Sequence, residues 1–174
     1  KNKNADAESL IIENVNNLEE LNQALLTYLV KVSATQLSDE DENMVSKLHS
    51  ILNDFYREVE IAHNMMKYTK SVINQDLKFS NHVYEQIDLL NEKLTLQYEN
   101  IVKLFEDNSK AILYVIDDLE EEIDNMRSKM IKQHIDRLEK NECSPASSGV
   151  FINLVSNLER AGDHLSYIAH TIVE

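Results

Sequence analysis

The sequence predicts an all-α protein, a bundle of five long helices, and three observations carry this prediction. The chain of 174 residues holds only two glycines and one proline. Tight turns depend on these residues, so a β-sheet protein with many hairpins is excluded. Apolar residues recur at spacings of three and four along most of the chain, which is the period of an amphipathic helix. Each periodic stretch far exceeds the average helix of about 11–12 residues, as is typical of a helical bundle.

Five apolar stripes define the helices in chain order. They run from Ile11 to Leu29, Val45 to Met66, Val83 to Leu104, Ile112 to Met130 and Leu154 to Ile172. The polar residues Asn22 and Gln97 interrupt the first and third stripes. From the stripes and the breaks between them we expect helices over residues 6–34, 40–77, 80–107, 109–140 and 147–173.

The breaks between stripes carry the residues that start and stop helices. Ser38 precedes an acidic first turn and is predicted to cap the second helix. Ser80 and the pair Asn108–Ser109 are predicted to cap the next two. Residues 143–145, Cys-Ser-Pro, end the fourth helix, and Ser147 or Ser148 starts the fifth. Neither glycine nor proline marks the boundary near 76–80.

Composition narrows the classes of function. A net charge of −14 argues against a nucleic-acid partner, which requires clusters of Lys and Arg, and is compatible with cation binding. The single cysteine, Cys143, excludes an intramolecular disulfide and a cysteine-rich zinc site. No apolar run reaches the roughly 20 residues of a membrane span, so we expect a soluble domain. The sequence has neither a glycine-rich phosphate loop nor a catalytic constellation, and we expect no enzyme.

An internal repeat relates the two parts of the chain. The octapeptide around Phe55 aligns with the one around Leu158, 103 positions later, and the apolar stripes stay in phase. Upstream, Glu13 aligns with Glu121, 108 positions later. We therefore expect a first half over residues 1–78, with two helices and no front helix, and a second half over 79–174 with three. The missing helix should leave an exposed apolar groove on the first half, filled by an upstream segment, a partner or self-association.

The octapeptide at 157–164 contains the strongest site signal. Glu159 and Asp163 share one helix face, and the chain's second glycine, Gly162, lies between them. Glu121 and Asp124 lie one turn apart on the preceding helix and can face the same neighbour. Converging carboxylates repel one another unless a cation binds, and oxygen ligands suit Mg²⁺, Mn²⁺, Ca²⁺ or ferric iron. The alternative is that these acids only form solvated helix faces, which are common in so acidic a chain.

Three stretches of sequence resemble a known family. Asn-Leu-Glu-Arg-Ala-Gly-Asp-His at 157–164, followed by Tyr-Ile-Ala at 167–169, resembles the signature of PhoU domains. The Glu-Glu-Glu-Ile-Asp string at 120–124 and Tyr-Leu-Val at 28–30 are most similar to the soluble C-terminal portion of sodium–phosphate cotransporter family proteins. The resemblance implies two three-helix bundles side by side, here without the first helix.

The resemblance also implies metal ligands. The family's Glu/Asp-x-x-x-Asp motifs bind metal ions, often iron, with manganese, magnesium and zinc as further expectations. Glu159 and Asp163 match the second motif, and Glu121 and Asp124 match acidic positions on the preceding helix. The first motif departs from the pattern, because Tyr56 replaces an acid and Glu60 an aspartate. Its remaining ligands would be Glu60 and Glu13, with Asp54 as a third.

The function that the resemblance implies is regulatory. We expect a non-enzymatic accessory domain of phosphate transport on the cytoplasmic side of the cell membrane. Its partner would be a transporter domain in the same chain or in another one, and a homodimer is a further expectation. The alternative is a helical protein–protein interaction module in which the metal motifs are vestigial.

Overall fold

The computed structural model describes residues 2–107 and 109–173, with side chains from Glu8 onward. Five long α-helices account for almost all of this part of the chain, and no strand occurs in it. The all-α fold class and the five helices are therefore confirmed. In chain order the helices are α1 (Asn2–Ser33), α2 (Asp39–Asn74), α3 (Asn81–Asp107), α4 (Lys110–Glu139) and α5 (Pro145–Val173).

α2 and α4 are each followed by a left-handed residue that is not glycine. Asp76 after α2 and Asn141 after α4 adopt the left-handed conformation, with φ of 47° and 58°. In each case the next residue's N–H donates to a carbonyl five positions back, from Leu77 to Val72 and from Glu142 to Arg137. Both ends are Schellman motifs, which satisfy helix-terminal carbonyls. Asp and Asn tolerate this backbone conformation better than other residues that carry a side chain, so α2 stops at Asn74, three residues earlier than predicted.

Serine side chains cap three of the helices. The Ser38 hydroxyl accepts from Asp41 N–H at 3.2 Å and the Ser80 hydroxyl from Val83 N–H at 3.4 Å, as predicted. Ser109 precedes α4 but its side chain makes no cap bond, and Asn108 lies outside the described residues. The predicted start of α5 is wrong. The helix begins at Pro145, because Ser144 accepts from Ser147 N–H at 3.1 Å and proline suits the first helical position.

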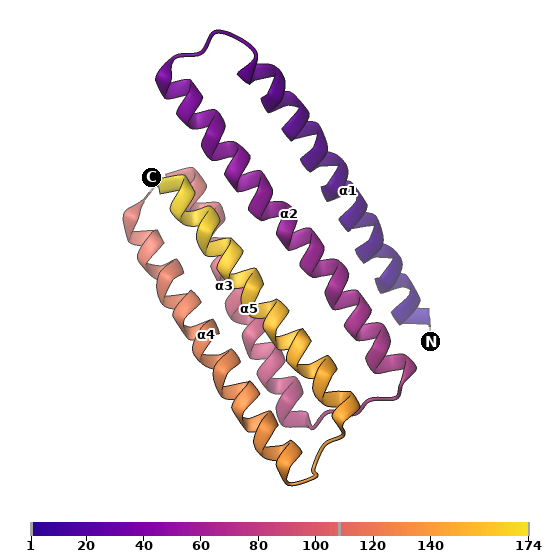
Figure 1. Ribbon diagram of the computed structural model, residues 1–174. Helices are drawn as coiled ribbons and strands as arrows, with labels where there is room; N and C mark the ends of the chain where they lie inside the picture. Colours follow the sequence, from indigo (N-terminus) through magenta and orange to yellow (C-terminus); the bar gives the residue numbers. More distant parts are fainter. Residues whose placement is uncertain (1, 108, 174) are drawn as a thin grey trace.

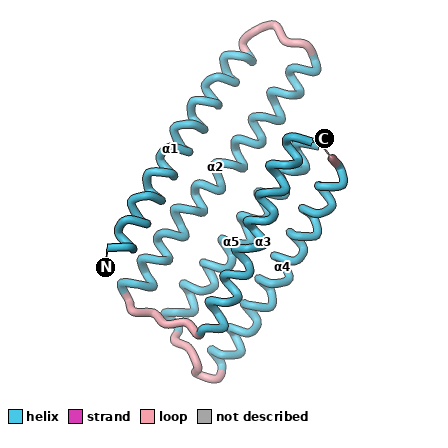
Figure 2. The backbone as a smooth tube through the Cα atoms, turned by 180° about the vertical axis from the view of Figure 1, so that it is seen from behind, coloured by secondary structure: helices cyan, strands magenta, loops and turns pink. Residues whose placement is uncertain are grey.

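The helices run side by side along a common direction (Figure 1). α3, α4 and α5 all contact one another, α2 lies against α5, and α1 contacts α2 alone. α1 therefore forms one edge of the molecule, which is also clear from behind (Figure 2). α1 packs on α2 as α4 packs on α5, the arrangement that the repeat predicts. A division at residues 78 and 79 stays a prediction.

The hydrophobic core lies around α5, the helix with neighbours on three sides. Phe151, Val155 and Ala169 of α5 are fully buried, together with Leu90 of α3 and Ile116 of α4. Burial of this apolar surface is the main stabilising term of such a bundle. The core therefore fixes how α4 and α5 face each other, and with them the acidic residues at its edge.

Several large apolar side chains of α1 are exposed; whether they mark the groove expected from an absent front helix stays a prediction. Leu21, Leu25 and Tyr28 of α1 are 55%, 41% and 64% exposed. Their positions differ by four, three and seven residues, so they share one side of the helix. Among the described helices, none has the length and hydropathy of a membrane span.

Candidate metal centre

Three carboxylates meet at the seam between α4 and α5. Glu120 and Asp124 of α4 and Asp163 of α5 each offer one oxygen, and these three oxygens all lie within 4.8 Å of one another. We call this group the carboxylate triad. Glu120 and Asp163 are half-buried and Asp124 is exposed. Helical geometry brings the residues together, because positions four apart lie on the same side of a helix.

Glu159 extends the triad along α5. It lies one helical turn before Asp163, is half-buried, and interacts with both Asp163 and Asp124. Arg127, one turn after Asp124 on α4, is the positive group that acts on both Glu159 and Asp163. Four acids therefore gather at the edge of the core, with Arg127 beside them and Arg160 acting on Asp163 as well.

Glu120, Glu159 and Asp163 have pKa values above those of isolated carboxyls. Burial, and then repulsion from Asp163 and Asp124, raise the pKa of Glu159 against the opposing effect of Arg127. Burial and the Asp124 carboxylate likewise raise the pKa of Asp163. The pKa of Glu120 is raised by burial and by the neighbouring acids, Asp124 foremost. Burial is the larger cause of these shifts, and repulsion between like charges at close range adds to it. A bound cation would replace the protons.

The donor set fits a hard cation. Carboxylate oxygens bind Ca²⁺ at about 2.3–2.6 Å and Mg²⁺ at about 2.0–2.1 Å, so two ligands on opposite sides of an ion lie roughly 4–5 Å apart. The triad's oxygens are already within 4.8 Å. Glu159, which interacts with Asp124 and Asp163, is placed to serve as a fourth ligand. Among the described residues no other group of three His, Cys, Asp or Glu comes as close.

Of the residues assigned to this centre from the sequence, three lie where they were expected and one does not. Glu159, Asp163 and Asp124 come together. Glu121 is exposed and lies outside the triad, and Glu120 takes its place. Successive residues point about 100° apart around a helix. Glu120 therefore borders the buried stripe of Leu119 and Ile123, whereas Glu121 points to solvent.

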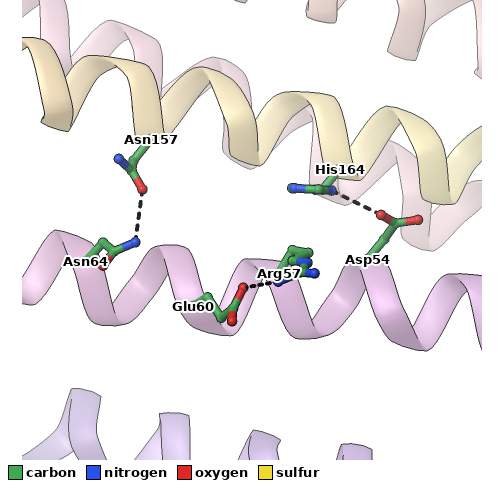
Figure 3. A network of polar contacts seen from close by, with 6 residues as sticks. All are labelled: Asp54, Arg57, Glu60, Asn64, Asn157 and His164. Carbon is green, nitrogen blue, oxygen red and sulfur yellow. Dashed lines mark hydrogen bonds and ion pairs between the residues drawn. The ribbon is translucent and has the colours of Figure 1, made fainter.

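The residues of the first motif do not come together. Glu60 pairs with Arg57 of the same helix at 2.6 Å, and Glu13 is exposed on α1. Asp54 lies on the side of α2 that faces α5, where its Oδ1 is 3.0 Å from Nδ1 of His164 (Figure 3). The first motif therefore provides no cluster comparable to the triad.

A half-buried acid that the sequence did not reveal lies close to this pair. Glu58 is one turn after Asp54, and its Oε1 is buried with no hydrogen-bond partner among the described residues. Burial, and then repulsion from Asp54, raise the pKa of Glu58 to about 8. The burial of the Glu58 carboxyl results from tertiary packing, which the sequence does not show. In the sequence, only its position one turn from Asp54 could have drawn attention to it.

Gly162 lies against α3 and α4 at the back of the triad. A methyl group at this position would meet Gln97 Oε1 and two carbons of Ile123, each at 3.4 Å. These are ordinary contact distances at their short end, so the glycine allows close helix packing without a clash forcing its presence. The absent side chain lets α5 approach α4 at Gly162, the residue immediately before Asp163.

Comparison with known proteins finds similarity to PhoU domains in both sequence and fold. The family model of the PhoU domain matches residues 87–172, which include all four acids of the centre. PhoU from Pseudomonas aeruginosa has the same fold, with a TM-score of 0.85 at 12% sequence identity. The match covers 95% of this chain and 78% of that one. A search of curated proteins found no match. The resemblance to PhoU domains seen in the sequence is thus supported by an independent family match and by the fold.

Proposed function

We propose that this chain is a PhoU-like regulatory domain of phosphate transport that binds a metal ion at Glu120, Asp124, Glu159 and Asp163. The observation that carries the proposal is the meeting of three carboxylate oxygens within 4.8 Å, inside the segment that matches the PhoU domain. The role is regulatory and non-enzymatic, in line with the family to which this segment is similar.

The finer proposal concerns the partner. The strings at 120–124 and 28–30 are similar to those of sodium–phosphate cotransporter proteins. We propose that the domain acts on the cytoplasmic side of the membrane, attached to a phosphate transporter or in contact with one. The uncovered apolar side of α1, with Leu21, Leu25 and Tyr28, offers a surface for such a contact.

The metal would link two helices of the bundle. Glu120 and Asp124 belong to α4, and Glu159 and Asp163 to α5, so an ion shared by the four acids crosslinks α4 to α5. An ion that binds only the folded state stabilises it by about 2.7 kcal/mol at a hundredfold excess over its dissociation constant. Metal binding would thus make the packing of α4 on α5 more rigid and raise the stability of the second half. Iron, manganese, magnesium and zinc are the ions to test.

Thermal melting tests the site directly. We expect the EDTA-treated protein to melt at a higher temperature when Mn²⁺, Mg²⁺, Zn²⁺ or Fe³⁺ is added, and Asp163→Asn to lose most of this shift. Asp118→Asn is a matched control, because Asp118 is an exposed acid of α4 outside the triad. The metal content of the untreated protein, measured by mass spectrometry, identifies the ion. Equal shifts in wild type and Asp163→Asn would place binding elsewhere.

The second candidate is a helical interaction module in which the acidic motifs are vestigial. The degenerate first motif favours it, because Arg57 already neutralises Glu60 and Tyr56 replaces an acid. A protein that carries no metal when purified and shows no metal-dependent melting, yet binds a transporter, would support this candidate over the first.

A further inference from the structure

The structure contains two pockets at equivalent positions of the repeat. One borders the triad and includes Asp163, Ser166, Tyr167 and His170 of α5. The other lies on α2 and includes the residues 103 positions earlier, Glu60, His63, Asn64 and Lys67. The repeat found in the sequence therefore appears in the structure as a pair of related surface pockets, one in each half.

The two pockets differ in charge. The one on α5 contains three acids, Asp117, Glu120 and Asp163. The one on α2 contains three permanent cations, Arg57 and Lys67 of α2 and Arg160 of α5. We call the second one the basic pocket. Three cations in one pocket are unusual in a chain with 17 Lys and Arg against 31 Asp and Glu.

The basic pocket also contains two acids, and one of them is paired with a cation of the pocket. Glu60 forms an ion pair with Arg57 at 2.6 Å, and Glu19 of α1 lies 3.9 Å from Nε2 of His63. Among residues whose side chains are described, no carboxylate lies within 4.0 Å of the charged nitrogens of Lys67 or Arg160. The pocket thus keeps a net positive charge.

The His63 side chain adds an unused hydrogen-bonding group. Its Nε2 is buried and has no hydrogen-bond partner among the described residues, since 3.9 Å to Glu19 exceeds hydrogen-bond length. Buried polar nitrogens without a partner are uncommon, and each calls for a ligand, a water or an ion. In the tautomer that carries a proton on Nε2, this imidazole donates to an oxyanion bound beside the three cations.

We propose that the basic pocket binds a tetrahedral oxyanion of the phosphate class, held by Arg57, Lys67 and Arg160 with His63 as a further donor. Guanidinium groups match the oxygen spacing of phosphate and bind it through paired hydrogen bonds. The pocket volume of about 410 Å³ also admits the phosphoryl group of a larger molecule. This inference goes beyond the proposed function, because it uses none of the four acids assigned to the metal.

Calorimetric titration with inorganic phosphate tests the proposal. The protein is first treated with EDTA, so that phosphate cannot bind through a metal at the triad. We expect saturable binding, which Lys67→Gln weakens about tenfold, the effect of losing one charge-assisted hydrogen bond. Lys78→Gln is the matched control and should leave binding unchanged, because Lys78 is 81% exposed and lies outside the pocket.

Two further titrations define the ligand. Sodium chloride at equal ionic strength should produce no saturable signal, since a specific site needs oxygen acceptors. Tighter binding of inorganic phosphate than of glycerol 3-phosphate assigns the pocket to free phosphate, and the reverse order assigns it to a phosphorylated molecule. Absence of saturation, an equal response to chloride, or unchanged binding in Lys67→Gln would overturn the proposal.

The result is separable from the metal site. Asp163→Asn should retain phosphate binding while losing the metal-dependent rise in melting temperature, and Lys67→Gln should do the opposite. Lys67 is exposed on α2, and its replacement is expected to leave the fold intact, which circular dichroism verifies. Loss of both responses in both variants would contradict two independent sites.

Discussion

The side-chain amide of Gln97 donates a hydrogen bond to the main-chain carbonyl of Gly162 at 3.0 Å, inside the core. Gln97 belongs to α3 and is fully buried, and Gly162 immediately precedes Asp163 of the triad. The bond ties α3 to α5 beside the acidic centre. It leaves Gln97 Oε1 buried without a partner among the described residues, so part of its stabilising effect is offset by desolvation.

Two replacements of Gln97 should separate packing from hydrogen bonding. Gln97→Met keeps the volume and removes the unpaired oxygen, so we expect the free energy of unfolding to change by less than about 1 kcal/mol. Gln97→Ala leaves a cavity and should destabilise the fold by about 2–4 kcal/mol. Urea denaturation measures both. Equal losses in the two variants would show that the hydrogen bond, and not the packing, dominates.

The choice of ligand on α4 is testable with adjacent residues. We expect Glu120→Gln to reduce the metal-dependent rise in melting temperature, because Glu120 contributes an oxygen to the triad. Glu121→Gln should leave the rise unchanged, since Glu121 is exposed and lies outside the triad. The two variants remove the same charge from neighbouring positions. A larger effect in Glu121→Gln would reverse the assignment.

Glu58 should make stability fall as the pH rises. Its pKa is about 8 in the folded protein against an ordinary value of 4.5. Between these values the folded state keeps a proton that the unfolded chain has lost, so the stabilising effect is complete below about pH 4.5 and disappears toward pH 8. The raised pKa values of Glu120, Glu159 and Asp163 act in the same direction.

Removal of this titrating group gives the test. Glu58→Gln stays neutral at every pH, so the fall in unfolding free energy between pH 5.5 and pH 8 should shrink by about 1–3 kcal/mol. Urea denaturation at the two pH values measures the change. Glu99→Gln, at an exposed position of α3, serves as the control. An unchanged slope in Glu58→Gln would mean that this carboxyl is ionised in the fold.

The exposed side of α1 predicts association. We expect the chain to self-associate in solution, and Leu21→Glu combined with Leu25→Glu to lower the association measured by sedimentation velocity. Val30→Glu is the control, because Val30 is 61% exposed but lies about 140° around the helix from Leu25. A monomer at all concentrations would contradict self-association through this surface.

Much of the fold could be predicted because amphipathic helices place apolar residues at regular spacings of three and four in the sequence. Seven of the ten predicted helix ends lie within one residue of those observed, among them the beginnings of α3 and α4. The end of α2 was placed too late because Asp76, and not a glycine, adopts the left-handed conformation. Gln97 interrupts an apolar stripe in the sequence, yet it is fully buried, since its amide finds a partner on another helix.

The site was harder to predict for a geometric reason. The motif at 157–164 located Glu159 and Asp163, but the rotation of α4 decides whether Glu120 or Glu121 faces them. Adjacent residues differ by about 100°, and a run of three glutamates at 120–122 leaves the choice open. The pair of Asp54 and His164 joins residues 110 positions apart, a contact that only the packing of α2 on α5 creates.

The single interface of α1 has a consequence for motion. Because α1 contacts α2 alone, its detachment would leave the contacts among α3, α4 and α5 intact. Such sub-global opening requires less free energy than complete unfolding, and it is visible in amide hydrogen exchange. Backbone amides of α1 would then exchange much faster than those of α5. The acidic centre would persist during this opening. The basic pocket would open and close, because Glu19 of α1 forms part of its lining.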